Sequence, residues 1–209
     1  MSGGRGPSGV AVLPPALLAS TDLPIDAIPA GTPLHRVHRS TNHPIFFGPG
    51  PGAPPTYRFD SATGLFGVLY VGLSFTASFV ETVLRNPQRK MVAYSEVETR
   101  SSSLIYCRRE LKVVRLHGGG LQMLGLDNSI STGPYEPCGA WADALWRHPQ
   151  APDGVAFHSR HDPDEICLAI FERPPMPLQV DAPLRLIHQL PAIAKLLSAF
   201  GKSMALPPH

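Results

Sequence analysis

The sequence predicts a single domain of the α+β class built around a mixed sheet. Its 209 residues are about the length of one domain. Apolar segments typical of strands are separated by single helices and several short loops, and there is no internal repeat. The chain is 43% hydrophobic, which is enough to bury a sizeable core, so extensive disorder is not expected.

The N-terminal region differs in composition from the rest of the chain. Residues 1–33 are rich in proline, glycine and serine and have no sustained period. We expect an extended arm there, with one helical turn near 16–20, and we place the folded domain at 34–209. Its first strand is expected at 34–39, "LHRVHR". Prolines and glycines in 40–55 exclude a sheet ladder and indicate a loop.

A central strand and a helix follow. Residues 67–73, "GVLYVGL", are apolar on both alternating faces, which is typical of a buried strand. Residues 74–85 are predicted to form a helix, with Ser74 as the N-cap and Asn86-Pro87 as the stop.

The second half of the chain alternates between the two kinds of element. Strand residues are expected within 100–116, especially 111–116, and "GGG" at 118–120 indicates a turn. A helix is predicted at 139–148, and strands at 155–162 and 166–172. An amphipathic C-terminal helix is predicted at 190–206, with Pro191 in its first turn.

Composition excludes several functional classes. The net charge is +2 and the arginines are scattered, so direct nucleic-acid binding is not expected. The three cysteines form no CxxC pair, which disfavours a disulfide framework and a zinc site and fits a reducing compartment. No apolar run reaches the length of a membrane span, and prolines interrupt the nearest candidate signal. A cytoplasmic protein is therefore expected.

Three residues near the central strand have two interpretations each. On a helical wheel Glu81 lies on the polar half, where it either pairs with Arg85 in solvent or lines a cleft. Arg58 is either a solvated strand-edge residue or a ligand-binding one. The hydroxyl of Tyr70 in an apolar strand must find a partner or reach a cavity.

The polar segment "HSRHDPDE" at 158–165 contains residue types found in metal sites and in hydrolases. In an extended segment His158 and His161 point to opposite faces, so they do not chelate together, and no metal is expected. Ser159 has no GxSxG elbow around it, which disfavours a serine hydrolase. "HGGG" at 117–120 is interpreted as a turn rather than a phosphate loop.

Several motifs in order resemble one family. "LHRVHR", "YRFD", "GVLYVG", "SFVETVLR", "DGVAFHSRHD" and "CLAIFE" follow the order of the RES domain, named for its Arg, Glu and Ser, from about Leu34 to Arg173. The family's arginine is more often in a Gly-Arg-Trp setting, whereas Tyr57 and Phe59 flank Arg58 here.

The resemblance implies a fold and a function. The fold would be related to diphtheria-toxin-type ADP-ribosyltransferases. The protein would be the toxin of a toxin–antitoxin pair and would form a hetero-oligomer with an Xre-type DNA-binding antitoxin. Its activity would be destruction of NAD by phosphorolysis or hydrolysis, or ADP-ribosyl transfer to a host protein. A catalytically inactive interaction module is the third alternative. NAD would be a substrate rather than a cofactor, and no GxGxxG follows a strand.

The resemblance also implies the site residues. Arg36, Arg58, Tyr70, Glu81 and Ser159 occupy the matching positions. Cleavage of the nicotinamide–ribose bond passes through an oxocarbenium-like state, which a carboxylate such as Glu81 stabilises. Arg36 and Arg58, expected on neighbouring strands, would hold the pyrophosphate, Tyr70 would contact nicotinamide, and Ser159 would bind ribose or orient Glu81. The leaving group is already cationic, so no general acid is needed.

Overall fold

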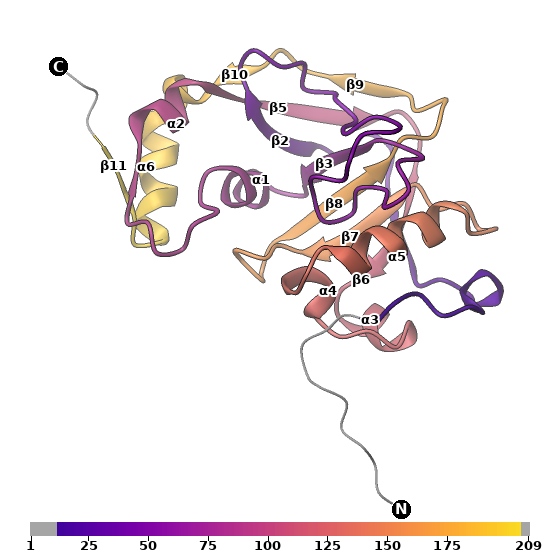
Figure 1. Ribbon diagram of the computed structural model, residues 1–209. Helices are drawn as coiled ribbons and strands as arrows, with labels where there is room; N and C mark the ends of the chain where they lie inside the picture. Colours follow the sequence, from indigo (N-terminus) through magenta and orange to yellow (C-terminus); the bar gives the residue numbers. More distant parts are fainter. Residues whose placement is uncertain (1–11, 206–209) are drawn as a thin grey trace, which may run out of the picture.

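The computed structural model describes residues 12–205, which fold around one large mixed sheet (Figure 1). The sheet order is β1-β6-β7-β8-β3-β2-β5-β10, with β9 also pairing with β5. Among the described residues, β6 and β7 form the only parallel pair of this sheet, and its other pairs are antiparallel. The strands are β1 (Ile25–Ile28), β2 (Leu34–Arg39), β3 (Val68–Gly72), β4 (Met91–Val92), β5 (Arg100–Cys107), β6 (Leu111–Leu116), β7 (Gly154–His158), β8 (Ile166–Phe171), β9 (Leu178–Val180), β10 (Leu184–Arg185) and β11 (Ser203–Met204).

The helices form two groups at the two ends of the sheet (Figure 1). One group, α3 to α5, lies along β6 and β7, and in the other, α2 and α6 lie at the left of the view with α1 between α6 and the strands. The helices are α1 (Phe75–Thr82), α2 (Tyr94–Glu98), α3 (Gly119–Met123), α4 (Ser129–Thr132), α5 (Glu136–Trp146) and α6 (Leu190–Ala199), with 3₁₀ turns at Leu18–Ser20 and Leu186–Gln189. No helix within 12–205 is both long and apolar enough to cross a membrane.

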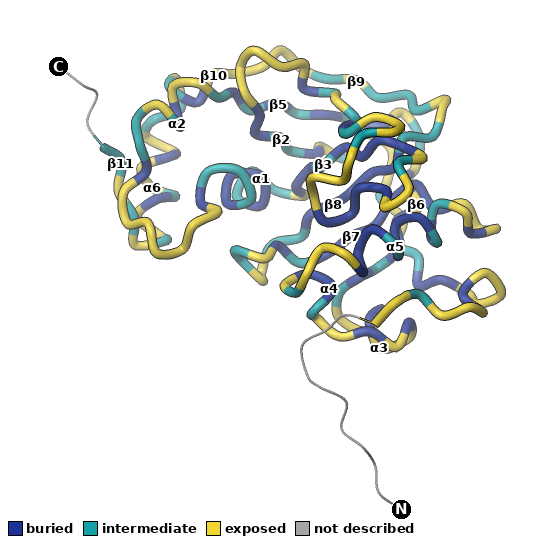
Figure 2. Tube along the Cα trace, in the orientation of Figure 1, coloured by how far each residue is buried: buried dark blue, intermediate teal, exposed yellow. Residues whose placement is uncertain are grey.

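Strand β3 separates two core clusters because its side chains alternate between the faces of the sheet. Val68 belongs to the cluster under α5, with Tyr70 packed against it. Leu69 and Val71 belong to the cluster on the opposite face. The central strands β3, β7 and β8 are accordingly buried along most of their length (Figure 2).

Helix α1 occupies a split in the sheet between β2 and β3. These two strands pair at one position only, His35 with Gly72. Beyond it, the backbone N–H of Val37 donates to the Ser78 hydroxyl of α1 at 2.6 Å. Gly72 permits the approach of the helix, because a Cβ atom there would lie 2.7 Å from the Cβ atom of Ala77.

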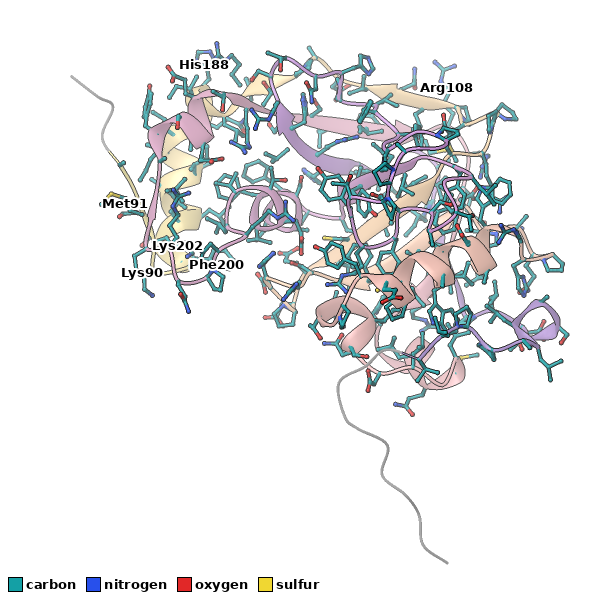
Figure 3. All side chains as sticks on the ribbon, in the orientation of Figure 1. Lys90, Met91, Arg108, His188, Phe200 and Lys202 are labelled. Atoms are coloured by element: carbon teal, nitrogen blue, oxygen red, sulfur yellow. The ribbon has the colours of Figure 1, made fainter. Side chains whose placement is uncertain are left out.

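The C-terminal part of the described chain fastens α1 from the outside. Ile193 and Leu197 of α6 belong to a third core cluster with Phe79 and Val80 of α1. The ammonium group of Lys202 donates to the carbonyl groups of residues 86, 87 and 89, which follow α1. Strand β11 then pairs with β4, and Figure 3 shows Lys202 close to Lys90 and Met91 at this edge.

The α+β class and most of the predicted elements are confirmed. The strands expected at 34–39, 67–73 and 166–172 are present with ends shifted by at most one residue, whereas the strand expected at 155–162 ends at His158. The strand residues expected within 100–116 are present, as β5 and β6. Ser74 caps α1 as predicted, and its hydroxyl accepts from the Ala77 N–H at 2.9 Å.

Other expectations were wrong in detail. The predicted N-terminal arm contains β1, which pairs with β6 along four residues. The C-terminal helix ends at Ala199 rather than 206, because Gly201 takes a left-handed conformation with φ 61°. Arg58 lies in a turn and not on a strand, because the Asp60 carboxylate accepts the backbone N–H groups of 56 and 57 there.

Candidate active site

A cavity of about 760 Å³ lies beside the split between β2 and β3. Its volume is within the range of about 300–1,000 Å³ typical of ligand sites. Four of the five candidate residues line it: Arg36, Arg58, Tyr70 and Glu81. The fifth, Ser159, contacts Glu81 directly. The fold therefore brings together five residues that span 124 positions of sequence, from 36 to 159.

The carboxylate of Glu81 is held by the loop that follows β7. The Ser159 hydroxyl donates to Glu81 Oε1 at 2.6 Å, and the backbone N–H of Arg160 donates to the same oxygen at 2.9 Å. Among the ion pairs of the described chain there is none between Glu81 and Arg85. Glu81 is half-buried and faces the cavity rather than open solvent.

Ser159 itself is oriented by its own loop. Its side chain is 2% exposed, and its oxygen accepts the backbone N–H groups of His161 and Asp162 at 3.1 and 3.2 Å. With these bonds made, its own proton is directed at Glu81. The far end of the loop is tied to α1 as well, because Ser74 donates to the carboxylate of Glu165. Two contacts therefore fix the loop 159–165 against the helix that carries Glu81.

Arg58 is buried, at 6% exposed, and not solvated. Its Nη1 donates to the carbonyl groups of Ile130 and Gly133 at 3.2 and 2.9 Å, at the end of α4. Its Nη2 has no hydrogen-bond partner among the described residues. The ring of Tyr135 covers the guanidinium group, with 4.6 Å between its centroid and Cζ. A buried guanidinium group with a free donor is suited to bind an anion.

Arg36, in β2, lies at another part of the cavity wall. Its Nη1 donates to the carbonyl groups of Pro44 and Phe46 at 2.8 and 3.2 Å. Burial lowers the pKa of Arg36 to about 10, and the charge of nearby Tyr57 opposes this effect. The guanidinium group therefore remains charged at neutral pH.

The hydroxyl of Tyr70 finds hydrogen-bond partners within the protein, as its apolar strand requires. Its hydroxyl donates to Asp60 Oδ1 at 2.9 Å and accepts from the Phe59 N–H at 2.9 Å, while its ring lines the cavity. Burial, together with Asp60, raises the pKa of Tyr70 well above its usual value.

Asp60 was not predicted as a site residue. It is 1% exposed and organises the turn that carries Arg58, and burial raises its pKa. The sequence signal that could have indicated Asp60 is the "YRFD" motif, of which it is the last residue.

The cavity carries an excess of positive charge. Six arginines line it, whereas Glu81 is the single carboxylate among the described residues of its wall. The arginines are Arg36, Arg39, Arg58, Arg85, Arg100 and Arg160. Burial lowers the pKa of neighbouring His161, Glu81 opposes this shift, and Arg85, Arg160 and Arg58 add to it. Such a field attracts an anionic ligand.

Metal and thiol chemistry have little basis in the described chain. Within 12–205 no group of three His, Cys, Asp or Glu residues is arranged to hold a metal ion. Cys107, Cys138 and Cys167 are buried free thiols. Burial raises the pKa values of Cys138 and Cys167, which disfavours their reactive thiolate forms.

Comparison with known proteins identifies the family. The family model of the RES domain matches residues 33–193. The chain belongs to the RES domain family. The match extends beyond Arg173, where the similarity read from the motifs ended. No curated protein gives a significant match.

A solved structure has a similar fold to this RES domain. It is a chain of the crystal structure of the M. tuberculosis MbcT–MbcA toxin–antitoxin complex. The TM-score is 0.57 at 20% sequence identity, and the match covers 78% of this chain and 90% of that chain. The similarity confirms the mixed α+β fold.

Proposed function

We propose that this RES domain protein is the toxin of a toxin–antitoxin system and that it cleaves the nicotinamide–ribose bond of NAD. The observation that carries the proposal is the position of Glu81. Its carboxylate is fixed by Ser159 and Arg160 at the wall of a cavity that also contains two candidate guanidinium groups and the ring of Tyr70.

Each residue has a role in the proposed reaction. The Glu81 carboxylate stabilises the positive charge that grows on the ribose as nicotinamide leaves. Ser159 positions that carboxylate through its hydrogen bond. Arg36 and Arg58 bind the pyrophosphate, for which Arg58 Nη2 is a free donor. Tyr70 offers its ring to nicotinamide, since its hydroxyl is already engaged by Asp60.

The test is release of nicotinamide from NAD by the purified protein. Glu81→Gln keeps the size of the side chain and removes its charge, so we expect kcat/KM to fall by at least about a hundredfold. Glu98→Gln, at an exposed position outside the cavity wall, serves as the matched control and should retain activity. Full activity of Glu81→Gln would refute the assignment.

The acceptor of the ADP-ribosyl group is the next question. Product masses measured with and without phosphate separate phosphorolysis from hydrolysis. With labelled NAD in a cell extract, label on one protein band would instead support ADP-ribosyl transfer to a host protein. A protein that neither consumes NAD nor slows growth would be an inactive interaction module.

The partner is proposed to be an Xre-type DNA-binding antitoxin that forms a hetero-oligomer with this chain. The antitoxin would block the cavity or bind around α1. Growth arrest on expression, relieved by co-expression of the adjacent gene and abolished by Glu81→Gln, would support this assignment.

A further inference from the structure

The exposed aromatic side chains of the described chain gather at the cavity. Phe46, Tyr57 and Tyr135 are 58%, 45% and 40% exposed, and all three line it. The other large apolar side chains that are exposed within 12–205 are aliphatic, and none lines the cavity. Exposed rings beside clustered arginines are suited to a ligand that combines flat rings with negative charge.

Two of these three rings already have a partner within the protein. Tyr57 contacts the ring of Tyr70 edge-on, with 5.5 Å between centroids, and Tyr135 covers Arg58. Phe46 is different, because its ring contacts no other ring or guanidinium group of the described chain in such a geometry. Because more than half of its surface is exposed, the ring can contact a ligand.

The local sequence fixes Phe46 in this position. Ile45 and Phe47 pack against the core cluster of one sheet face, whereas Phe46 between them is exposed and lines the cavity. The Arg36 guanidinium group binds the carbonyl of Phe46, which anchors the backbone. Gly48 leaves room for the ring, because a Cβ atom there would lie 2.4 Å from Phe46 Cε1. An aromatic ring held in this way loses little entropy on binding.

We propose that Phe46 is the platform on which the adenine ring of NAD stacks, an inference that rests on the proposed function. Glu81, held by Ser159, marks the part of the cavity wall where the reacting ribose would bind. In NAD the adenine is separated from that ribose by the pyrophosphate. Arg36 is a proposed pyrophosphate ligand and contacts residues 44–46, so the ring beside it lies where the adenine would follow.

The test is the affinity for ADP-ribose, which keeps the adenine and the pyrophosphate but has no bond to cleave. Titration calorimetry compares the wild type with Phe46→Ala, Phe46→Leu and Phe46→Trp. We expect the dissociation constant to rise about tenfold for Ala and for Leu, the size of one lost base stack, and to be retained for Trp. Leu65→Ala, at an exposed loop position outside the cavity, is the matched control. Thermal unfolding verifies that each variant is folded.

Each outcome decides one of the two proposals. Unchanged affinity in Phe46→Ala, wild-type affinity in Phe46→Leu, or absence of ADP-ribose binding by the wild type would overturn adenine stacking. Nicotinamide release from NAD in the same samples tests the proposed function separately. Cleavage with an unaffected Phe46→Ala would defeat the stacking alone. Tight, Phe46-dependent ADP-ribose binding without cleavage would defeat the reaction alone.

Discussion

The hydroxyl of one serine joins two distant parts of the chain at the candidate site. Ser159 lies 78 positions after Glu81 and holds its carboxylate from the loop that follows β7. Its oxygen is engaged by two backbone N–H groups, so the residue acts by positioning and not as a nucleophile.

Ser159→Ala is therefore expected to lower kcat for NAD cleavage more than it raises KM. A hydrogen bond to a charged group contributes about 1.5–3 kcal/mol, which corresponds to roughly tenfold to a hundredfold in rate. Steady-state kinetics measure the two constants. Ser198→Ala, at an exposed position of α6, is the control. A variant with unchanged kcat would show that Arg160 alone holds the carboxylate.

At this scale the sequence predicted residue types better than contacts. The helical wheel placed Glu81 on the polar face of its helix correctly, yet it could not distinguish solvent from a cavity, because what covers that face comes from 159–165. The expectation of a strand at Arg58 is wrong for a different reason. The carboxylate of Asp60 turns the chain there, and a propensity pattern does not contain that interaction.

At the scale of elements, the position of α1 depends on a close approach to β3. Gly72 is the point of contact, where a Cβ atom would also lie 2.7 Å from the backbone nitrogen of Ser78. Backbone atoms of a helix cannot yield as a flexible side chain does, so any side chain at 72 displaces α1 and, with it, Glu81.

We therefore expect Gly72→Ala to destabilise the fold by about 1–3 kcal/mol, the usual cost of overpacking, and to lower NAD cleavage in the fraction that remains folded. Urea unfolding gives the first quantity and initial rates give the second. Gly50→Ala is a matched control, because a Cβ atom there meets nothing within 4 Å. Equal stability of the two variants would show that α1 does not depend on its close approach to Gly72.

Long, apolar elements were predictable, whereas short ones were not. Strands β3 and β8 show in the sequence because burial on both faces selects unbroken apolar runs. Strands β4, β9, β10 and β11 have two or three residues each, and β1 lies among prolines. Their pairing is determined by the tertiary partner, so no local pattern indicates it.

For the whole molecule, burial acts on several histidines in the same direction. The pKa values of His35, His38, His117 and His161 are all lowered, in each case mainly by burial. As the pH falls through about 6.5, the unfolded chain takes up protons before the folded one does, so acidification favours unfolding.

The free energy of unfolding is thus expected to rise with pH up to about 6.5 and then to level off. Urea unfolding between about pH 5 and pH 8 measures it. His38→Gln, at a buried position, should flatten the slope, whereas His188→Gln, at an exposed position, should not. A stability that falls as the pH rises through this range would contradict the expected sign.

The hydrogen bonds of Lys202 and the pairing of β11 with β4 have a consequence for synthesis on the ribosome. The carbonyl groups that Lys202 binds lie 113 to 116 positions earlier in the chain. When Glu81 has left the ribosome, α6 and β11 have therefore not yet been synthesised. Both pack or pair with the region around α1 in the folded protein. Translation must pass nearly all of the described residues before this helix acquires its complete apolar cover.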